Sequence, residues 1–264
     1  MGKGGNSTIM SEGYDPVAWE RLRRQWGLTV LTAVSVAIVG YMFLSDWWTR
    51  RHGIQWTVTA GVVLTYELWL LWRYLDQNRC ESAGLLLDSL GIATAATLAR
   101  GLLTAAVAGF IVLPEPTGQT AWLPAVLYVV AVALDRVDGR LARQYGDTTM
   151  LGAKLDLEFD GLSLLVAGLL GIVYGTLPLW YLAVGLARPA FVIGRSLHRR
   201  RGGAVGSIPP STVRRPLTGV QMFVCSVALV PIVPSTVSIA LATVAMIPFV
   251  CVFVRDFHSV VQGA

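Results

Sequence analysis

The sequence has few charged residues for its length. Asp, Glu, Lys and Arg make up only 14% of its 264 residues, whereas 54% are apolar, and the mean hydropathy is +0.59. A soluble globule of this size needs more polar surface than such a composition supplies. The sequence therefore excludes an ordinary soluble domain and predicts a protein embedded in a membrane.

Cysteine and histidine are also scarce. The cysteines Cys80, Cys225 and Cys251 lie far apart and form no CxxC pair, and the three histidines are equally scattered. This spacing excludes a disulfide framework and a zinc site of the usual kind. The net charge of +5 comes from basic residues placed between apolar runs rather than on a separate domain. We therefore expect no nucleic-acid partner.

Long apolar runs recur along the chain, and they do not alternate with polar residues as strands of a membrane barrel would. About 20 apolar residues span the hydrocarbon core as a helix. The runs predict about eight transmembrane helices, near residues 28–46, 54–73, 92–113, 121–143, 150–174, 177–197, 217–233 and 236–255. The predicted fold class is thus an all-α integral membrane protein.

The distribution of basic residues predicts the orientation of these helices. Most Lys and Arg fall in residues 1–27, 74–91, 135–154, 195–216 and the C-terminal end of the chain. Cytoplasmic loops carry this excess of positive charge. We therefore expect a multi-pass protein of the cell membrane with both ends in the cytoplasm.

The chain divides by composition into an accessory part and a core. We expect a cytoplasmic segment at 1–27, an accessory transmembrane hairpin at 28–75, a cytoplasmic surface helix at 76–91, a six-helix catalytic core at 92–256 and a cytoplasmic tail at 257–264. The hairpin contains one buried acid, Glu67, which we expect to pair with Arg73. No internal repeat is visible, although inverted repeats are typical of a transporter.

Four aspartates stand within or near the membrane helices of the core. Asp135 and Asp138 are three residues apart, and Asp156 and Asp160 are four apart, so each pair shares one face of its helix. Carboxylates at membrane depth are costly unless they are paired, hydrated or bound to metal. Hard oxygen ligands of this kind suit Mg²⁺ or Mn²⁺, and two such ions are a usual device for displacement at phosphorus.

The expected depth of these residues supports a common site. Asp135, Asp160 and Arg100 each lie about 13 or 14 residues from the outer end of their helix, which is roughly 20 Å at 1.5 Å per residue. The site would then open to the cytoplasmic side, where a lipid headgroup and a soluble nucleotide can both reach it.

The spacing of these aspartates and of the residues beside them resembles a known signature. The segment reads Asp135-x-x-Asp138-Gly139-x-x-Ala142-Arg143, then eight residues, then Gly152-x-x-x-Asp156-x-x-x-Asp160. All eight positions are similar to the signature of the CDP-alcohol phosphatidyltransferase family, whose six-helix core would cover about residues 92–256. Thr97 and Arg100 further resemble a Thr-x-x-Arg element on the first core helix of that family.

The resemblance implies a set of roles. Asp135, Asp138, Asp156 and Asp160 would bind one or two Mg²⁺ or Mn²⁺ ions, and Asp160 would also be the general base. The cytidine nucleotide would contact Asp138, Gly139, Ala142 and Arg143, together with Thr97 and Arg100, while Gly152 would have a structural role. The partners implied are a CDP-linked lipid donor, a small alcohol or lipid acceptor, membrane lipids and a second copy of the chain in a homodimer.

The acceptor is not identified by the sequence. Basic residues of the later helices, Arg188, Arg195, Arg214 and Arg215, are candidates for binding a phosphate on it. Glycerol phosphate, inositol phosphate, serine and a second phospholipid all stay open as acceptors, and the donor lipid is either diacyl or ether-linked. Two alternatives to the enzyme also remain, namely a cation transporter that uses the carboxylates as its ion site and a non-catalytic lipid-binding or nucleotide-binding protein of the same fold.

Overall fold

A computed structural model describes residues 16–79, 86–145, 149–200 and 214–261, and within these ranges the protein is helical. The α-helices are α1 (Pro16–Trp47), α2 (Arg50–Tyr74), α3 (Gly91–Ala108), α4 (Trp122–Tyr145), α5 (Met150–Val173), α6 (Leu182–Arg200), α7 (Arg214–Ala228) and α8 (Ser235–Val261). Short 3-10 helices occur at Leu75–Gln77, Gly109–Val112, Gly118–Ala121 and Leu179–Tyr181. The described residues contain no strand, so the all-α prediction is confirmed.

Four segments are long and apolar enough to cross a membrane. They are Pro16–Trp47, Gly91–Val112, Gly118–Arg136 and Ser235–His258, and Pro216–Ala228 is a shorter apolar helix. Together they make the chain a multi-pass membrane protein. The expected count of eight spans is not confirmed, because α2, α5, α6 and the shorter α7 are not among these four segments. In α5, ionisable residues such as Lys154, Asp156 and Asp160 interrupt the apolar run.

The helix α1 begins earlier than its apolar run. Pro16 is its first residue, a position that proline favours because its fixed φ suits a helix start and its missing N–H leaves no hydrogen bond unmade. The helix therefore includes Arg21, Arg23 and Arg24, which we had placed in a separate segment. Because charged residues are compatible with a helix, α1 begins at Pro16 rather than near residue 28, where the predicted span begins.

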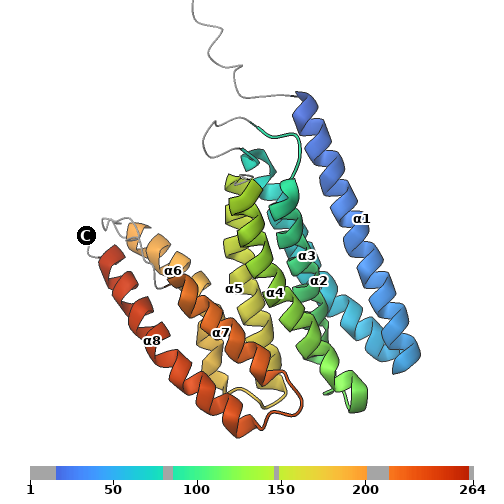
Figure 1. The fold of residues 1–264 in the computed structure, drawn as a ribbon, viewed down its shortest axis with the longest axis vertical. Coiled ribbons are helices and arrows are strands. Elements are labelled where there is room, and N and C mark those ends of the chain that lie inside the picture. The colour runs from blue at the N-terminus through green and yellow to red at the C-terminus, as the bar shows by residue number, and fades with distance from the viewer. Residues whose placement is uncertain (1–15, 80–85, 146–148, 201–213, 262–264) are drawn as a thin grey trace, which may run out of the picture. The chain divides into compact units, whose positions relative to one another are not determined.

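The chain divides into two compact units, and the first contains residues 1–105 and 133–159. Within it α1 and α2 form a hairpin and lie side by side (Figure 1). Thr49 caps α2, since its side chain accepts a hydrogen bond from the His52 N–H at 3.3 Å. Gly40 of α1 leaves space for the ring of Trp56 on α2, and a Cβ at Gly40 would collide with that ring. The accessory hairpin is therefore closely packed.

A buried apolar cluster joins this hairpin to α5. Its members include Leu22 of α1, Leu70 and Leu71 of α2, and Leu155 and Phe159 of α5, all at most 3% exposed. Side chains packed this tightly exclude water from the neighbouring faces of the helices. The cluster thus fixes α5 against the hairpin through side chains that neighbour Asp156 and Asp160 in the sequence.

The stretch at 76–91 differs from the prediction. Its described residues hold the 3-10 helix Leu75–Gln77 and an isolated bridge between Arg79 and Leu86, and not the expected surface helix. Asn78 is fully buried and donates hydrogen bonds to the carbonyl oxygens of Leu87, at 3.1 Å, and Ser89, at 2.8 Å. This asparagine satisfies backbone groups that a helix would have paired internally.

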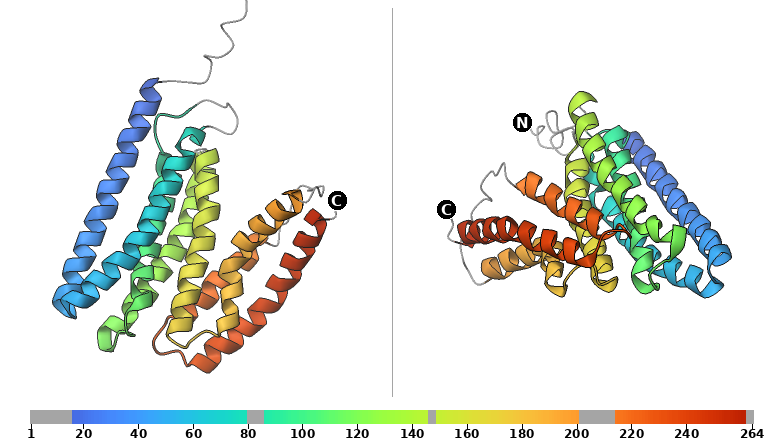
Figure 2. Two further views of the ribbon diagram at one scale, coloured as in Figure 1. Left: turned by 180° about the vertical axis from the view of Figure 1, so that it is seen from behind. Right: turned by 60° about the horizontal axis from the view of Figure 1, so that its bottom comes forward.

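The second unit contains residues 106–132 and 160–264, and in it α6, α7 and α8 lie together (Figure 2). Its buried polar contacts join three segments. Tyr181 donates to Gln221 Oε1 at 2.7 Å, and Gln221 donates to the carbonyl oxygen of Ala245 at 2.9 Å. Buried polar side chains in contact across helices stabilise a membrane bundle when they satisfy one another.

Candidate active site

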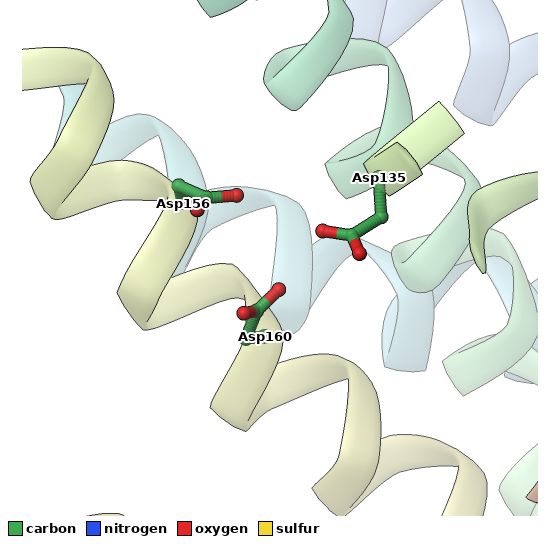
Figure 3. A group of neighbouring side chains, drawn as sticks. All are labelled: Asp135, Asp156 and Asp160. Atoms are coloured by element: carbon green, nitrogen blue, oxygen red, sulfur yellow. The ribbon is translucent and has the colours of Figure 1, made fainter. Parts of the chain in front are cut away.

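Three of the predicted metal-binding aspartates converge. Asp135 lies on α4 and Asp156 and Asp160 lie one turn apart on α5, and their carboxylates point toward one another (Figure 3). One oxygen from each can be chosen so that all three lie within 4.8 Å of one another. Asp160 is the first residue of the second unit, but α5 continues unbroken across that boundary, so the helix itself places Asp160 relative to Asp156.

The chemistry of this cluster fits a divalent cation. Three half-buried carboxylates supply only hard oxygen donors, and no histidine or cysteine takes part among the described residues. Such a set suits Mg²⁺ or Mn²⁺ better than zinc or copper. Without a positive charge between them, three carboxylates this close would repel one another strongly.

Arg100 of α3 supplies part of that positive charge. Its guanidinium donates to the carboxylate of Asp135, and to Asp156 both at Oδ1, 3.0 Å away, and at the main-chain oxygen, 3.2 Å away. The Arg100 side chain is only 1% exposed, whereas those of Asp135 and Asp156 are 25% and 37% exposed. A buried arginine on α3 therefore links α3 to α4 and α5, while the carboxylates of Asp135 and Asp156 remain partly exposed.

The start of α5 is built to place its aspartates. Thr149 caps the helix, because its hydroxyl oxygen accepts a hydrogen bond from the Gly152 N–H at 3.0 Å. A Cβ at Gly152 would lie 3.1 Å from that hydroxyl and 3.2 Å from the hydroxyl of Thr94 on α3. Gly152 thus allows α5 to approach α3 closely at the end where the site lies.

Comparison with known proteins gives the family of this chain. The family model described as CDP-alcohol phosphatidyltransferase matches residues 90–257, which is more than half of the chain. The protein belongs to the CDP-alcohol phosphatidyltransferase family. No curated protein and no solved structure matches it. The resemblance found in the sequence is thereby confirmed, and membership indicates a transferase of substituted phosphate groups.

The second half of the α4 motif is only partly described. Asp138, Gly139, Ala142 and Arg143 lie on the helix α4, but their side chains are outside the described part of the structure. Their predicted roles in metal and nucleotide binding stay predictions. Thr97 on α3 is 3% exposed and donates to the Ala93 carbonyl oxygen at 3.1 Å.

The basic residues expected to bind the acceptor lie on two helices, α6 and α7, and have different neighbours. Arg188 of α6 packs over α5 beside Asp160, since its Cδ would lie 3.1 Å from a Cβ at Gly161. Arg195 lies further along α6, about two turns after Arg188, and is half-buried. Arg214 of α7 is held by Asp256 of α8, with Arg214 Nε donating to Asp256 Oδ2 at 2.6 Å. The side chain of the remaining candidate, Arg215, lies outside the described part.

Sequence reasoning missed two features of the site. The first is that Arg100, which we had assigned to the nucleotide, pairs with two of the aspartates. The second concerns Glu67, whose expected partner Arg73 instead lies over the ring of Trp69. Arg73 is six positions after Glu67 on α2, so the two side chains point about 240° apart around the helix. This spacing could have excluded the pair from the sequence alone.

Proposed function

We propose that this protein transfers a phosphatidyl or archaetidyl group from a CDP-linked lipid to the hydroxyl of an alcohol and releases CMP. The observation that carries the proposal is the convergence of Asp135, Asp156 and Asp160 within a chain of this family. Displacement at phosphorus needs a site that gathers negative charge and offers a base, and three half-buried carboxylates meet both requirements.

The aspartates would hold one or two Mg²⁺ or Mn²⁺ ions, with Asp138 as a fourth ligand. A bound divalent ion would neutralise the pyrophosphate oxygens and stabilise the charge that develops on the leaving CMP. Arg100 keeps Asp135 and Asp156 at a fixed separation, because a single guanidinium is bonded to both. The cluster is thus arranged before any ligand arrives, which reduces the reorganisation needed during the reaction.

In the proposed reaction Asp160 accepts the proton of the acceptor hydroxyl. The hydroxyl oxygen forms a bond to the phosphorus that carries the lipid, while the bond from that phosphorus to the CMP oxygen breaks and CMP takes the electron pair. Asp160 suits this role because it lies one turn along α5 from Asp156 and its carboxylate is within the cluster.

The acceptor side of the reaction is proposed for α6. Arg188 runs beside Gly161, the residue after Asp160, so it can bring a phosphate-bearing acceptor close to the base. This position favours a phosphorylated polyol such as glycerol phosphate or inositol phosphate. We further propose that the site faces the cytoplasm, as the basic loops predict.

The test is CMP release by the purified protein in detergent. CDP-diacylglycerol or CDP-archaeol is supplied with Mg²⁺ or Mn²⁺ and with glycerol phosphate, inositol phosphate, serine or a phospholipid, one at a time. Release that depends on one acceptor and stops on adding a chelator supports the proposal and names the substrate. No release with any combination, together with metal uptake into vesicles, would favour a cation transporter instead.

A further inference from the structure

The end of the accessory hairpin where α1 begins and α2 ends carries four arginines, namely Arg21, Arg23, Arg24 and Arg73. Two of them are paired with acids. Arg21 forms an ion pair with Asp88, and Arg24 Nη2 donates to Glu20 Oε1 at 2.6 Å. The positive charges of Arg21 and Arg24 are therefore matched within the protein.

Arg23 and Arg73 lie against aromatic rings instead. Arg23 Cζ is 5.9 Å from the ring centroid of Trp72, and Arg73 Cζ is 5.6 Å from that of Trp69. Among the described residues neither arginine forms an ion pair with an acid, and this holds also for Asp76, three residues after Arg73. An indole ring attracts a cation without carrying a net negative charge. Both arginines are exposed, so two positive charges are available to an anion.

The tryptophans that contact these arginines are held by further aromatic side chains. The ring centroid of Trp72 is 4.9 Å from that of Trp26 and 6.3 Å from that of Trp19, and Trp69 stacks on Tyr66 at 6.0 Å. Tryptophan and tyrosine are enriched at the level of the lipid headgroups in membrane proteins. The aromatic rings thus indicate that Arg23 and Arg73 lie at this level.

An exposed apolar stripe on α2 leads to the arginines. Val58, Val62, Tyr66 and Trp69 are exposed and follow one another at intervals of three or four residues, so they share one face of the helix. The helix α2 packs along α1, which is long and apolar enough to cross a membrane. The stripe therefore offers a surface for acyl chains next to the two unmatched charges.

We propose that Arg23 and Arg73 form a binding site for an anionic phospholipid whose acyl chains lie along the exposed face of α2. The phosphate accepts charge-assisted hydrogen bonds from the guanidinium groups. In a zwitterionic lipid the cation of the headgroup offsets the phosphate, so two unmatched arginines favour a lipid with a net negative charge. A soluble phosphate would make no use of the apolar stripe, and for this reason we assign the site to a lipid.

The site gives the accessory hairpin a ligand of its own. The hairpin lies outside residues 90–257, which match the family, and the argument uses none of the residues of the proposed reaction. A wild type that releases no CMP would therefore contradict the transferase reaction without changing the test of this site.

The test counts the phospholipids bound to the full chain by native mass spectrometry from detergent. Phosphatidylglycerol or phosphatidylcholine with the same acyl chains is added, and the wild type should bind phosphatidylglycerol more tightly. Arg23→Gln and Arg73→Gln should each weaken that binding by about 5-fold, and the double variant by about 25-fold, while phosphatidylcholine binding stays unchanged. Other basic regions of the chain are the same in all variants, so the comparison isolates this site.

Arg24→Gln is the matched control. It removes the same formal charge from the position next to Arg23, where Glu20 already offsets it, and we expect it to bind phosphatidylglycerol as the wild type does. Equal losses in Arg23→Gln and Arg24→Gln would overturn the proposal, because net charge alone would then explain them. Equal affinity of the wild type for the two lipids would overturn it as well.

The double variant separates the site from other roles of the same surface. If it loses phosphatidylcholine together with phosphatidylglycerol, the surface binds acyl chains alone. A lower thermal unfolding midpoint with an unchanged lipid preference would assign a structural role to the two arginines, and a smaller dimer fraction with unchanged lipid binding would assign the surface to a second copy of the chain. Each of these results overturns the proposal, and the single variants decide if the double variant does not fold.

Discussion

Replacing Gly101 by alanine probes the packing of α3 beside Arg100. The new methyl group would lie 2.6 Å from Phe159 Cε2, about an ångström closer than an ordinary carbon contact, and 3.0 Å from Glu67 Oε2. Phe159 is 1% exposed within its apolar cluster, so its ring has no free space into which to turn. Overpacking of this kind costs typically about 1–3 kcal/mol.

A matched control is available on α2. Gly61 is also a helical glycine, but a Cβ there would meet nothing within 4 Å. The gain in helix propensity on changing glycine to alanine is similar at both positions, so the difference between the two variants isolates the overpacking. At about 2–4 °C per kcal/mol, we expect the unfolding midpoint of Gly101→Ala to lie about 2–12 °C below that of Gly61→Ala.

Thermal unfolding followed by the fluorescence of the nine tryptophans measures this difference. The same samples should show reduced CMP release for Gly101→Ala at temperatures where it is folded, because Phe159 precedes Asp160 and Gly101 follows Arg100. Equal midpoints for the two variants would refute the close approach of α3 to α5, and equal activities would refute its importance for the site.

Three further predictions concern single side chains. Asp160→Asn should abolish CMP release while Mn²⁺ binding stays measurable, and undiminished turnover would remove Asp160 from the role of base. Thr149→Ala should destabilise the protein by about 1 kcal/mol through loss of the α5 cap, as measured by chemical denaturation in detergent. Asp256→Asn weakens charged hydrogen bonds to Arg214 and Arg255, so we expect a stability loss of about 1–3 kcal/mol, and an unchanged midpoint would contradict this pairing.

Much of the architecture follows from local sequence patterns. Each predicted apolar run overlaps one α-helix of the structure, because hydrophobic length and helix periodicity are local properties. The runs 92–113, 177–197 and 217–233 extend beyond the ends of α3, α6 and α7. The spacing of Asp156 and Asp160 placed both on one face of a helix for the same reason. The common depth inferred for Asp135, Asp160 and Arg100 agrees with the cluster and with the contact between Arg100 and Asp135.

What the sequence could not predict depends on contacts between distant segments. Nothing local to Glu67 shows that Gly101 is its neighbour, and nothing local to Asn78 shows that it binds the carbonyl oxygens of Leu87 and Ser89. Such contacts depend on how whole helices pack. The surface helix expected at 76–91 was wrong for the described residues because a buried asparagine there stabilises a non-helical backbone.

The joint between the hairpin and α5 has a consequence for synthesis in the cell. Lys154 Nζ donates to Gln77 Oε1, and the Met150 N–H donates to the Arg79 carbonyl oxygen at 3.2 Å. The first pair lies 77 residues apart in the chain, so at 5–20 residues per second about 4–15 s pass between the synthesis of the two partners. α3 is synthesised within that interval, and Arg100 is made 56 residues before its partner Asp156. The contacts that join this hairpin to α5 can therefore form only after α5 has been synthesised.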